Sequence, residues 1–148
     1  MNLFGVMEVS GSALEAERIR AEVVAANMAN AETTRTADGG PYRRQHVVFT
    51  SEAPQQSFVS QFIGQAGSGD AQLGGVRVSA VVADQGPPLR RYDPGAPDAD
   101  KDGYVSYPDI NPLTEMVDLM GATRAYGLNS SAVQAEKGMI SASLDILK

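Results

Sequence analysis

Four aspartates between residues 98 and 109 have the spacing of a calcium-binding loop. The run reads DADKDGYVSYPD, with three aspartates at alternate positions and a fourth at the twelfth position. Alternate aspartates direct carboxylate oxygens toward one centre, and a glycine after them permits the sharp turn that such a loop requires. The pattern supports one functional hypothesis, a secreted calcium-binding module. Its candidate ligands are Asp98, Asp100, Asp102 and Asp109.

The residues around this run argue against a paired-helix calcium site. The preceding residues read YDPGAP, whose two prolines and glycine prevent an entering helix. Pro108 stands at position eleven, where an exiting helix should already have begun, and Asp109 is shorter than the usual bidentate glutamate. We therefore favour an aspartate-rich turn of the Asx type that connects a strand to a helix, and we predict no metal or other cofactor.

Enzymatic patterns are missing from the sequence. His46 is the only histidine, and its position in a strand-like run predicts a structural or solvent-facing role. The sequence contains no nucleophile-elbow, phosphate-loop or dinucleotide fingerprint. It also contains no cysteine, which excludes disulfides, thiolate metal sites and cysteine nucleophiles. We predict that the protein is not an enzyme.

The net charge and the hydropathy of the sequence argue against nucleic acid and membranes as partners. The 148 residues carry a net charge of −6, which repels nucleic acid and anionic membranes, so no nucleic-acid partner is predicted. Two basic pairs, Arg43-Arg44 and Arg90-Arg91, are interpreted as solvated side chains. No apolar stretch is long enough to cross a bilayer, and no cleaved secretory signal is predicted, so we expect no direct membrane insertion.

The first segment of the chain, residues 1–35, predicts a helix. SALE at 12–15 has the form of a capping box, so a helix either begins at Ser12 or passes through it. Small and apolar residues recur seven apart and form a narrow stripe that permits close approach of a second helix. The stripe consists of Val9, Ala16, Ile19, Val23, Ala26 and Asn30.

The last segment, residues 111–148, predicts a second helix. Asn111 can cap it, and Pro112 suits its first position. Five residues recur at intervals of seven and form the predicted seam, whereas the companion row beside it is small or polar, so the helix requires neighbours for stability. The seam consists of Leu119, Tyr126, Val133, Ile140 and Leu147, and the companion row of Ala122, Asn129, Glu136 and Ser143.

The middle of the chain, residues 36–110, predicts a small β-rich and loop-rich region. Residues 42–49 and 76–84 are rich in β-branched side chains, and 58–64 is a third candidate strand. Residues 64–75 are glycine-rich and predict a flexible loop. The expected fold is α+β, with the N- and C-terminal helices paired as an antiparallel coiled coil.

The junction after the first helix carries the most specific pattern. It reads AANMANAETTRTADGGPYRRQHVVF from 25 to 49, and the amides of Asn27 and Asn30 can bond backbone groups or partner helices where the helix ends. From the residues alone, a polar helix end followed by a threonine-rich turn is the simpler interpretation.

The same junction resembles flagellar basal-body rod proteins, in which an N-x-A-N run ends the N-terminal helix and leads into a T-R-T-x-x-G-G-P-Y turn. The matching residues are Asn27, Ala29, Asn30, Thr34, Arg35, Thr36, Gly39, Gly40, Pro41 and Tyr42. Residues 97–148, including DGYV at 102–105, are similar to the C-terminal part of the FlgC family of proximal-rod proteins. Residues 54–75 carry little of this pattern.

The resemblance implies a structural subunit of the axial drive shaft that transmits motor torque. It implies export through the flagellar type III apparatus without a cleaved signal peptide, and a place in the periplasmic rod of the basal body. The implied partners are other rod proteins and copies of the chain itself in a helical assembly, close to the export apparatus and the inner-membrane ring. The residues expected at the assembly interface are Ile19, Val23, Asn27, Asn30, Leu119, Tyr126, Asn129, Val133 and Ile140.

Overall fold

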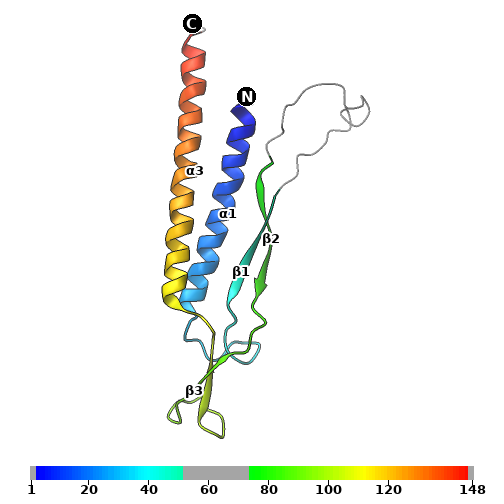
Figure 1. Ribbon diagram of the computed structural model, residues 1–148, viewed down its shortest axis with the longest axis vertical. Helices are drawn as coiled ribbons and strands as arrows, with labels where there is room; N and C mark the ends of the chain where they lie inside the picture. Colours follow the sequence, from blue (N-terminus) through cyan, green and yellow to red (C-terminus); the bar gives the residue numbers. More distant parts are fainter. Residues whose placement is uncertain (1–2, 52–73, 147–148) are drawn as a thin grey trace, which may run out of the picture.

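The protein consists of two long helices and two short β-hairpins (Figure 1). The computed structural model describes residues 3–51 and 74–146. The third candidate strand at 58–64, nearly all of the loop predicted at 64–75, and Leu147 lie outside the described residues. The expected α+β fold, with antiparallel terminal helices and a small strand region between them in the sequence, is confirmed.

The two helices run side by side in opposite directions. Helix α1 spans Leu3–Ala29, and helix α3 spans Pro112–Ile146. The predicted start of α3 is confirmed, because the Asn111 Oδ1 atom accepts a hydrogen bond from the amide of Leu113 at 3.0 Å. An asparagine in this position satisfies a backbone donor that has no partner inside the helix.

Small and polar residues form the contact between α1 and α3. Ala16 and Val24 of α1 and Ala122 of α3 are buried there, together with Glu115 and Glu136. The seam predicted for α3 is therefore not its most buried row. The buried residues Ala122 and Glu136 belong to the companion row beside it. Small side chains let the two backbones approach closely, and this favours the companion row over the bulkier seam.

Of the two predicted alternatives at Ser12, the helix passes through this residue rather than beginning there. Helix α1 begins at Leu3, so the Ser12 side chain lies in the helix interior. Its hydroxyl donates to the carbonyl of Val9 at 2.8 Å and accepts from the amide of Val76 at 3.1 Å. Ser12 thus joins the helix to the first residue of a strand.

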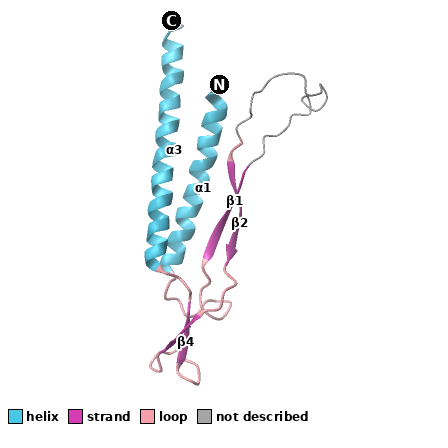
Figure 2. Ribbon diagram, viewed as in Figure 1, coloured by secondary structure: helices cyan, strands magenta, loops and turns pink. Residues whose placement is uncertain are grey.

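The first hairpin lies against α1 on the side away from α3 (Figure 2). Strands β1, Gln45–Ser51, and β2, Val76–Ala83, are antiparallel, with Gln45 opposite Ala83 and Ser51 opposite Val76. Both strands match the segments predicted from their β-branched residues. The register shifts at Val48/Phe49, where a bulge bends the hairpin along the helix.

The second hairpin lies below the helices and contains a strand that the sequence did not predict. Strand β3 spans Leu89–Tyr92, and its partner β4, Tyr104–Tyr107, occupies what was predicted to be a connector into the second helix. Ring contacts stabilise the pairing: Tyr92 and Tyr104 meet edge to face at 5.3 Å, and the Arg91 guanidinium lies 4.5 Å from the centre of the Tyr107 ring.

Gly103 offers a test of the second hairpin, with Gly40 as a matched control. Both glycines have positive φ angles, 79° and 85°, so alanine costs about 1 kcal/mol at either position. A Cβ at Gly103 would also lie 2.8 Å from the Tyr92 ring, whereas a Cβ at Gly40 meets nothing within 4 Å. We expect Gly103→Ala to lower the free energy of unfolding by about 1 kcal/mol more than Gly40→Ala, because the Tyr92 ring must move from Tyr104. Tyrosine near-UV circular dichroism during urea unfolding measures this difference, and equal losses would contradict it.

Candidate functional site

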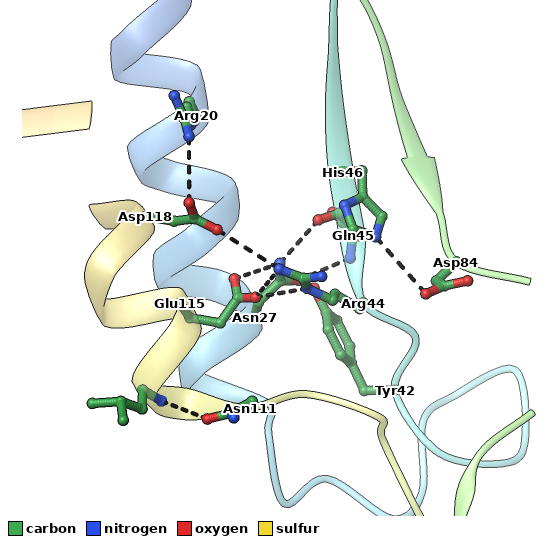
Figure 3. A network of polar contacts seen from close by, with 11 residues as sticks. Arg20, Asn27, Tyr42, Arg44, Gln45, His46, Asp84, Asn111, Glu115 and Asp118 are labelled. Atoms are coloured by element: carbon green, nitrogen blue, oxygen red, sulfur yellow. Dashed lines mark hydrogen bonds and ion pairs between the residues drawn. The ribbon is translucent and has the colours of Figure 1, made fainter. Parts of the chain in front are cut away.

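A cluster of polar side chains joins the base of the helix pair to the first hairpin (Figure 3). Its members come from the end of α1, the start of β1 and the start of α3. We call this set the basal cluster, and it consists of Arg20, Asn27, Tyr42, Arg44, Gln45, Glu115 and Asp118.

Asn27 lies at the centre of the basal cluster and is 1% exposed. Its Nδ2 atom donates to the Gln45 carbonyl at 2.9 Å and to Glu115 Oε2 at 3.1 Å. Its Oδ1 atom accepts from the Gln45 amide at 2.9 Å and from the Tyr42 hydroxyl at 3.2 Å. Every donor and acceptor of the side-chain amide is therefore used. The contact with Gln45 occupies both backbone groups of that residue, as a neighbouring strand would.

Glu115 is as deeply buried as Asn27, and its carboxylate forms an ion pair with Arg44. Its Oε1 atom lies 2.6 Å from Arg44 Nε and 2.5 Å from Arg44 Nη2. Glu115 is 1% exposed, whereas Arg44 reaches the surface. A buried carboxylate is tolerated only when a cation and hydrogen bonds replace its water. Arg44 supplies both from the segment that leads into β1, so this ion pair connects the hairpin to α3.

Tyr42 is the fourth hydrogen-bond contact of the Asn27 side chain. Burial, and then the negative charge of Glu115, raise the pKa of the Tyr42 hydroxyl above its ordinary value of 10.0. The hydroxyl therefore remains protonated at physiological pH and keeps donating to Asn27. The raised pKa and the hydrogen bond to Asn27 both favour the protonated form of the Tyr42 hydroxyl.

Asp118 extends the cluster toward solvent. It lies 3.4 Å from Arg20 of α1 and 3.8 Å from Arg44, so it contacts cations from two different elements. These contacts are half exposed, and such pairs contribute little to stability individually.

The threonine-rich turn after α1 has its own partner in the aspartate-rich run. The Thr34 hydroxyl donates to Asp98 Oδ2 at 2.8 Å, and Arg35 Nη2 lies 2.8 Å from Asp98 Oδ1. Gly39 and Gly40 both have positive φ angles, which explains the paired glycines of the pattern. The turn thus fixes the second hairpin relative to α1.

The aspartates of the predicted calcium loop do not converge. Asp100 Oδ1 accepts from the amides of Asp102 and Tyr104 at 3.0 and 2.9 Å, and its other oxygen pairs with Arg90. Among residues 3–51 and 74–146, no three acidic, histidine or cysteine side chains are grouped as a metal ion would require. The calcium hypothesis gains no support. The Asx-type turn is confirmed, although it joins β3 to β4 rather than a strand to a helix.

The predicted interface residues fall into three groups. Asn27 is committed to the basal cluster, and Asn30 Nδ2 donates to the Ala26 carbonyl at 2.9 Å, which ends α1. Tyr126 is 44% exposed on α3. The others are half-buried, and among them Ile19 and Val23 line hollows between α1 and the first hairpin. The role of all nine in assembly stays a prediction. The half-buried residues are Ile19, Val23, Leu119, Asn129, Val133 and Ile140.

Arg44 and Glu115 were missed as site residues. Both basic pairs were interpreted as solvated, which is wrong for Arg44, whereas Arg43 is exposed and donates to the Asp84 carbonyl at 3.2 Å. Adjacent residues near a strand point to opposite sides, so one arginine of such a pair faces inward. Glu115 stands seven residues before Ala122, on the companion row, and this spacing was the available signal.

His46 lies at the surface, close to a single carboxylate. His46 Nε2 lies 3.8 Å from Asp84 Oδ2, and both side chains are about half exposed, as expected of a solvent-facing histidine. None of the described helices combines the length and the apolar character needed to cross a bilayer.

Comparison with known proteins identifies the family of the chain. Residues 7–35 match the family model described as flagella basal body rod protein, and residues 101–146 match the one described as flagellar basal body rod FlgEFG protein C-terminal. The flagellar basal-body rod protein FlgC of Bacillus subtilis is 43% identical over the full length of both chains. The chain belongs to the FlgC family. The FlgC of Borreliella burgdorferi is 40% identical over 100% of this chain and 99% of its own, and that of Salmonella typhimurium 38% over 95% and 94%.

The matched segments contain both buried residues of the basal cluster. Asn27 lies in the segment 7–35, and Glu115 lies in the segment 101–146. The two matched segments, at the end of α1 and the start of α3, therefore meet in space through a direct hydrogen bond.

The Arg44–Glu115 pair can be tested by charge removal. Arg44→Met leaves Glu115 buried without its cation, so we expect a loss of about 3 kcal/mol in the free energy of unfolding. Adding Glu115→Gln removes the uncompensated charge and keeps an acceptor for Asn27, so the double variant should be more stable than Arg44→Met alone. Arg43→Met is the matched control and should cost about 0.5 kcal/mol or less. Urea unfolding measures all three, and a double variant less stable than the single would contradict the interpretation.

Asp100 should make the second hairpin sensitive to acid. The Tyr104 amide, then the Asp102 amide and Arg90, lower the pKa of the Asp100 carboxyl below 3.8. A lowered folded-state pKa contributes stability above the unfolded pKa, and this contribution is lost as pH falls through the folded value. We therefore expect the Tyr104 amide resonance to titrate at a pH below 3.8 and to lose this titration in Asp100→Asn. Asp102→Asn, which keeps the amide that bonds Asp100, should leave the titration in place.

Proposed function

We propose that this chain is a structural subunit of the proximal rod of the flagellar basal body. Membership of the FlgC family over the whole chain is the observation that carries this proposal. The named relatives are basal-body rod proteins, so a structural role is proposed rather than an enzymatic one. In the rod, the chain assembles helically with other rod proteins and with copies of itself, and transmits motor torque.

The packing of the described residues supports a subunit that gains its burial by assembly. Among the described elements, α3 packs only against α1, and its opposite face is uncovered. Among residues 3–51 and 74–146, the buried apolar residues are few and mostly of modest size. They are Ala16, Val24, Val105, Ile110 and Ala122. A chain with so small a core is expected to complete its order when neighbouring subunits cover its helices.

The same small core fits the route by which the chain reaches the rod. We propose export through the flagellar type III apparatus as an unfolded chain without a cleaved signal peptide, and assembly in the periplasm close to the inner-membrane ring. Three segments act differently in this process: 1–35 and 111–148 as helices that pack against neighbours, and 36–110 as the part that fills the space between subunits.

Peptide mass spectrometry of detergent-extracted basal bodies tests the proposal. We expect the chain at a stoichiometry comparable with that of other rod proteins. The control is a preparation from a strain that lacks the gene, in which the peptides should be absent while those of the inner-membrane ring remain. Basal bodies with a complete rod and none of this chain would contradict the proposal.

Tyr126 provides a point test of the predicted assembly face. Because its side chain is 44% exposed, Tyr126→Asp should leave expression and the helical circular dichroism of the monomer unchanged. We expect loss of motility, since a carboxylate buried at a subunit contact without a partner costs several kcal/mol. Gln134→Asp, also exposed on α3, is the matched control and should remain motile. A motile Tyr126→Asp strain would remove this residue from the interface.

A further inference from the structure

Glu136 of α3 is buried without a partner for its charge. The side chain is 4% exposed, and its Oε2 atom accepts no hydrogen bond. No ion pair among the described residues includes it. Glu17 Oε2 also lacks a hydrogen bond, but it lies 3.8 Å from Arg20 Nη1 and so has a cation nearby. In the described part of the helix pair, Glu136 is therefore a buried carboxylate whose charge is uncompensated.

Glu136 lies level with the beginning of α1. It belongs to the same row of α3 as Glu115, which bonds Asn27 near the end of α1. Because the two helices are antiparallel, a position 21 residues after Glu115 lies beside the position 21 residues before Asn27, in the first turns of α1. We call residues 3–10 of α1 and 132–146 of α3 the free end of the helix pair (Figure 1).

The basic side chains of the sequence are badly placed to reach Glu136. The first of them is Arg18, about 18 Å along α1 from the turns that lie beside Glu136. Lys137 is exposed, and adjacent residues of a helix do not face each other. Arg124 precedes Glu136 by 12 residues, which is also about 18 Å of helix. The spacing of the cations thus leaves the carboxylate alone at the free end.

The opposite end of the helix pair is held by polar contacts. Asn27 and Arg44 bond Glu115 there, and Arg20 pairs with Asp118. Between the described residues of α1 and α3, the side-chain hydrogen bonds and ion pairs all lie at this end. A carboxylate buried without such partners loses its hydration and receives no replacement, so it opposes the packing that buries it.

We propose that Glu136 is a conformational device, whose buried charge keeps the free end of the helix pair loosely closed in the isolated chain. The pair then opens at the free end while the basal cluster still holds the other end. Because α1 begins at the free end, the part that opens first includes the first residues of that helix. The inference goes beyond the proposed rod function and does not depend on it, since it concerns the single chain.

Amide hydrogen exchange of the purified full chain tests the inference, because it measures local opening segment by segment. Glu136→Gln removes the charge and keeps the shape, and Glu136→Met removes the polar atoms as well. We expect both variants to raise the protection of the free end by about tenfold or more, with the larger effect in Glu136→Met. Protection near Asn27 and Glu115 should not change. The matched control is Glu8→Gln, which removes one exposed charge from the start of α1 and should leave the free end as it is.

Three results would overturn the inference. The first is a wild-type free end that is protected as strongly as the residues around Asn27 and Glu115. The second is unchanged or lower protection of the free end in both Glu136 variants, which would show that the carboxylate does not weaken the packing. The third is an equal increase in Glu8→Gln, which would assign the effect to net charge rather than to burial. A chain absent from basal bodies would bear on the rod function alone.

Discussion

The fold depends on one side chain, the amide of Asn27, which joins three elements that are distant in the sequence. It bonds both backbone groups of Gln45 and the carboxylate of Glu115, and it accepts from Tyr42. A side-chain amide has the same donor and acceptor as a peptide group, so it can take the place of a neighbouring strand at the start of β1. Because Asn27 is buried, each of these bonds would be costly to lose without replacement.

Helix α1 also sets the position of the first hairpin along its length. Asn27 holds the first residue of β1, and Ser12 holds the first residue of β2 through its hydroxyl. These two residues are 15 positions apart in the helix, about 22 Å, and β1 from Gln45 to Ser51 covers about 20 Å. The matching lengths allow two polar side chains to fix both ends of the hairpin, with few large apolar contacts between them.

The sequence predicted the parts of this fold that depend on local spacing. The two helices, the Asn111 cap, the strands β1 and β2 and the Asx-type turn all follow from periodicity and from capping or turn residues. The prediction assigned the buried face of α3 to the wrong row, because two adjacent rows share the seven-residue spacing. The correct row contains two acidic residues, Glu115 and Glu136, and acidic residues are usually exposed, so its burial was not expected. Local spacing could have indicated that Arg44 and Glu115 each face inward, but not that the two meet, because they are 71 positions apart in the sequence. Strand β4 was missed because its aspartate-rich approach resembles a metal loop.

The Asn27–Glu115 hydrogen bond joins residues 88 positions apart, and this separation has a kinetic consequence. At a synthesis rate of roughly 10 residues per second, α1 emerges from the ribosome about 9 seconds before the start of its partner helix. Helix α1 alone has no second helix on which to bury Ala16 and Val24, so native pairing waits for the end of the chain. Contacts between residues so far apart in the sequence also form slowly, because closing the long intervening loop costs conformational entropy. The topology itself therefore keeps the growing chain open until its last helix is complete.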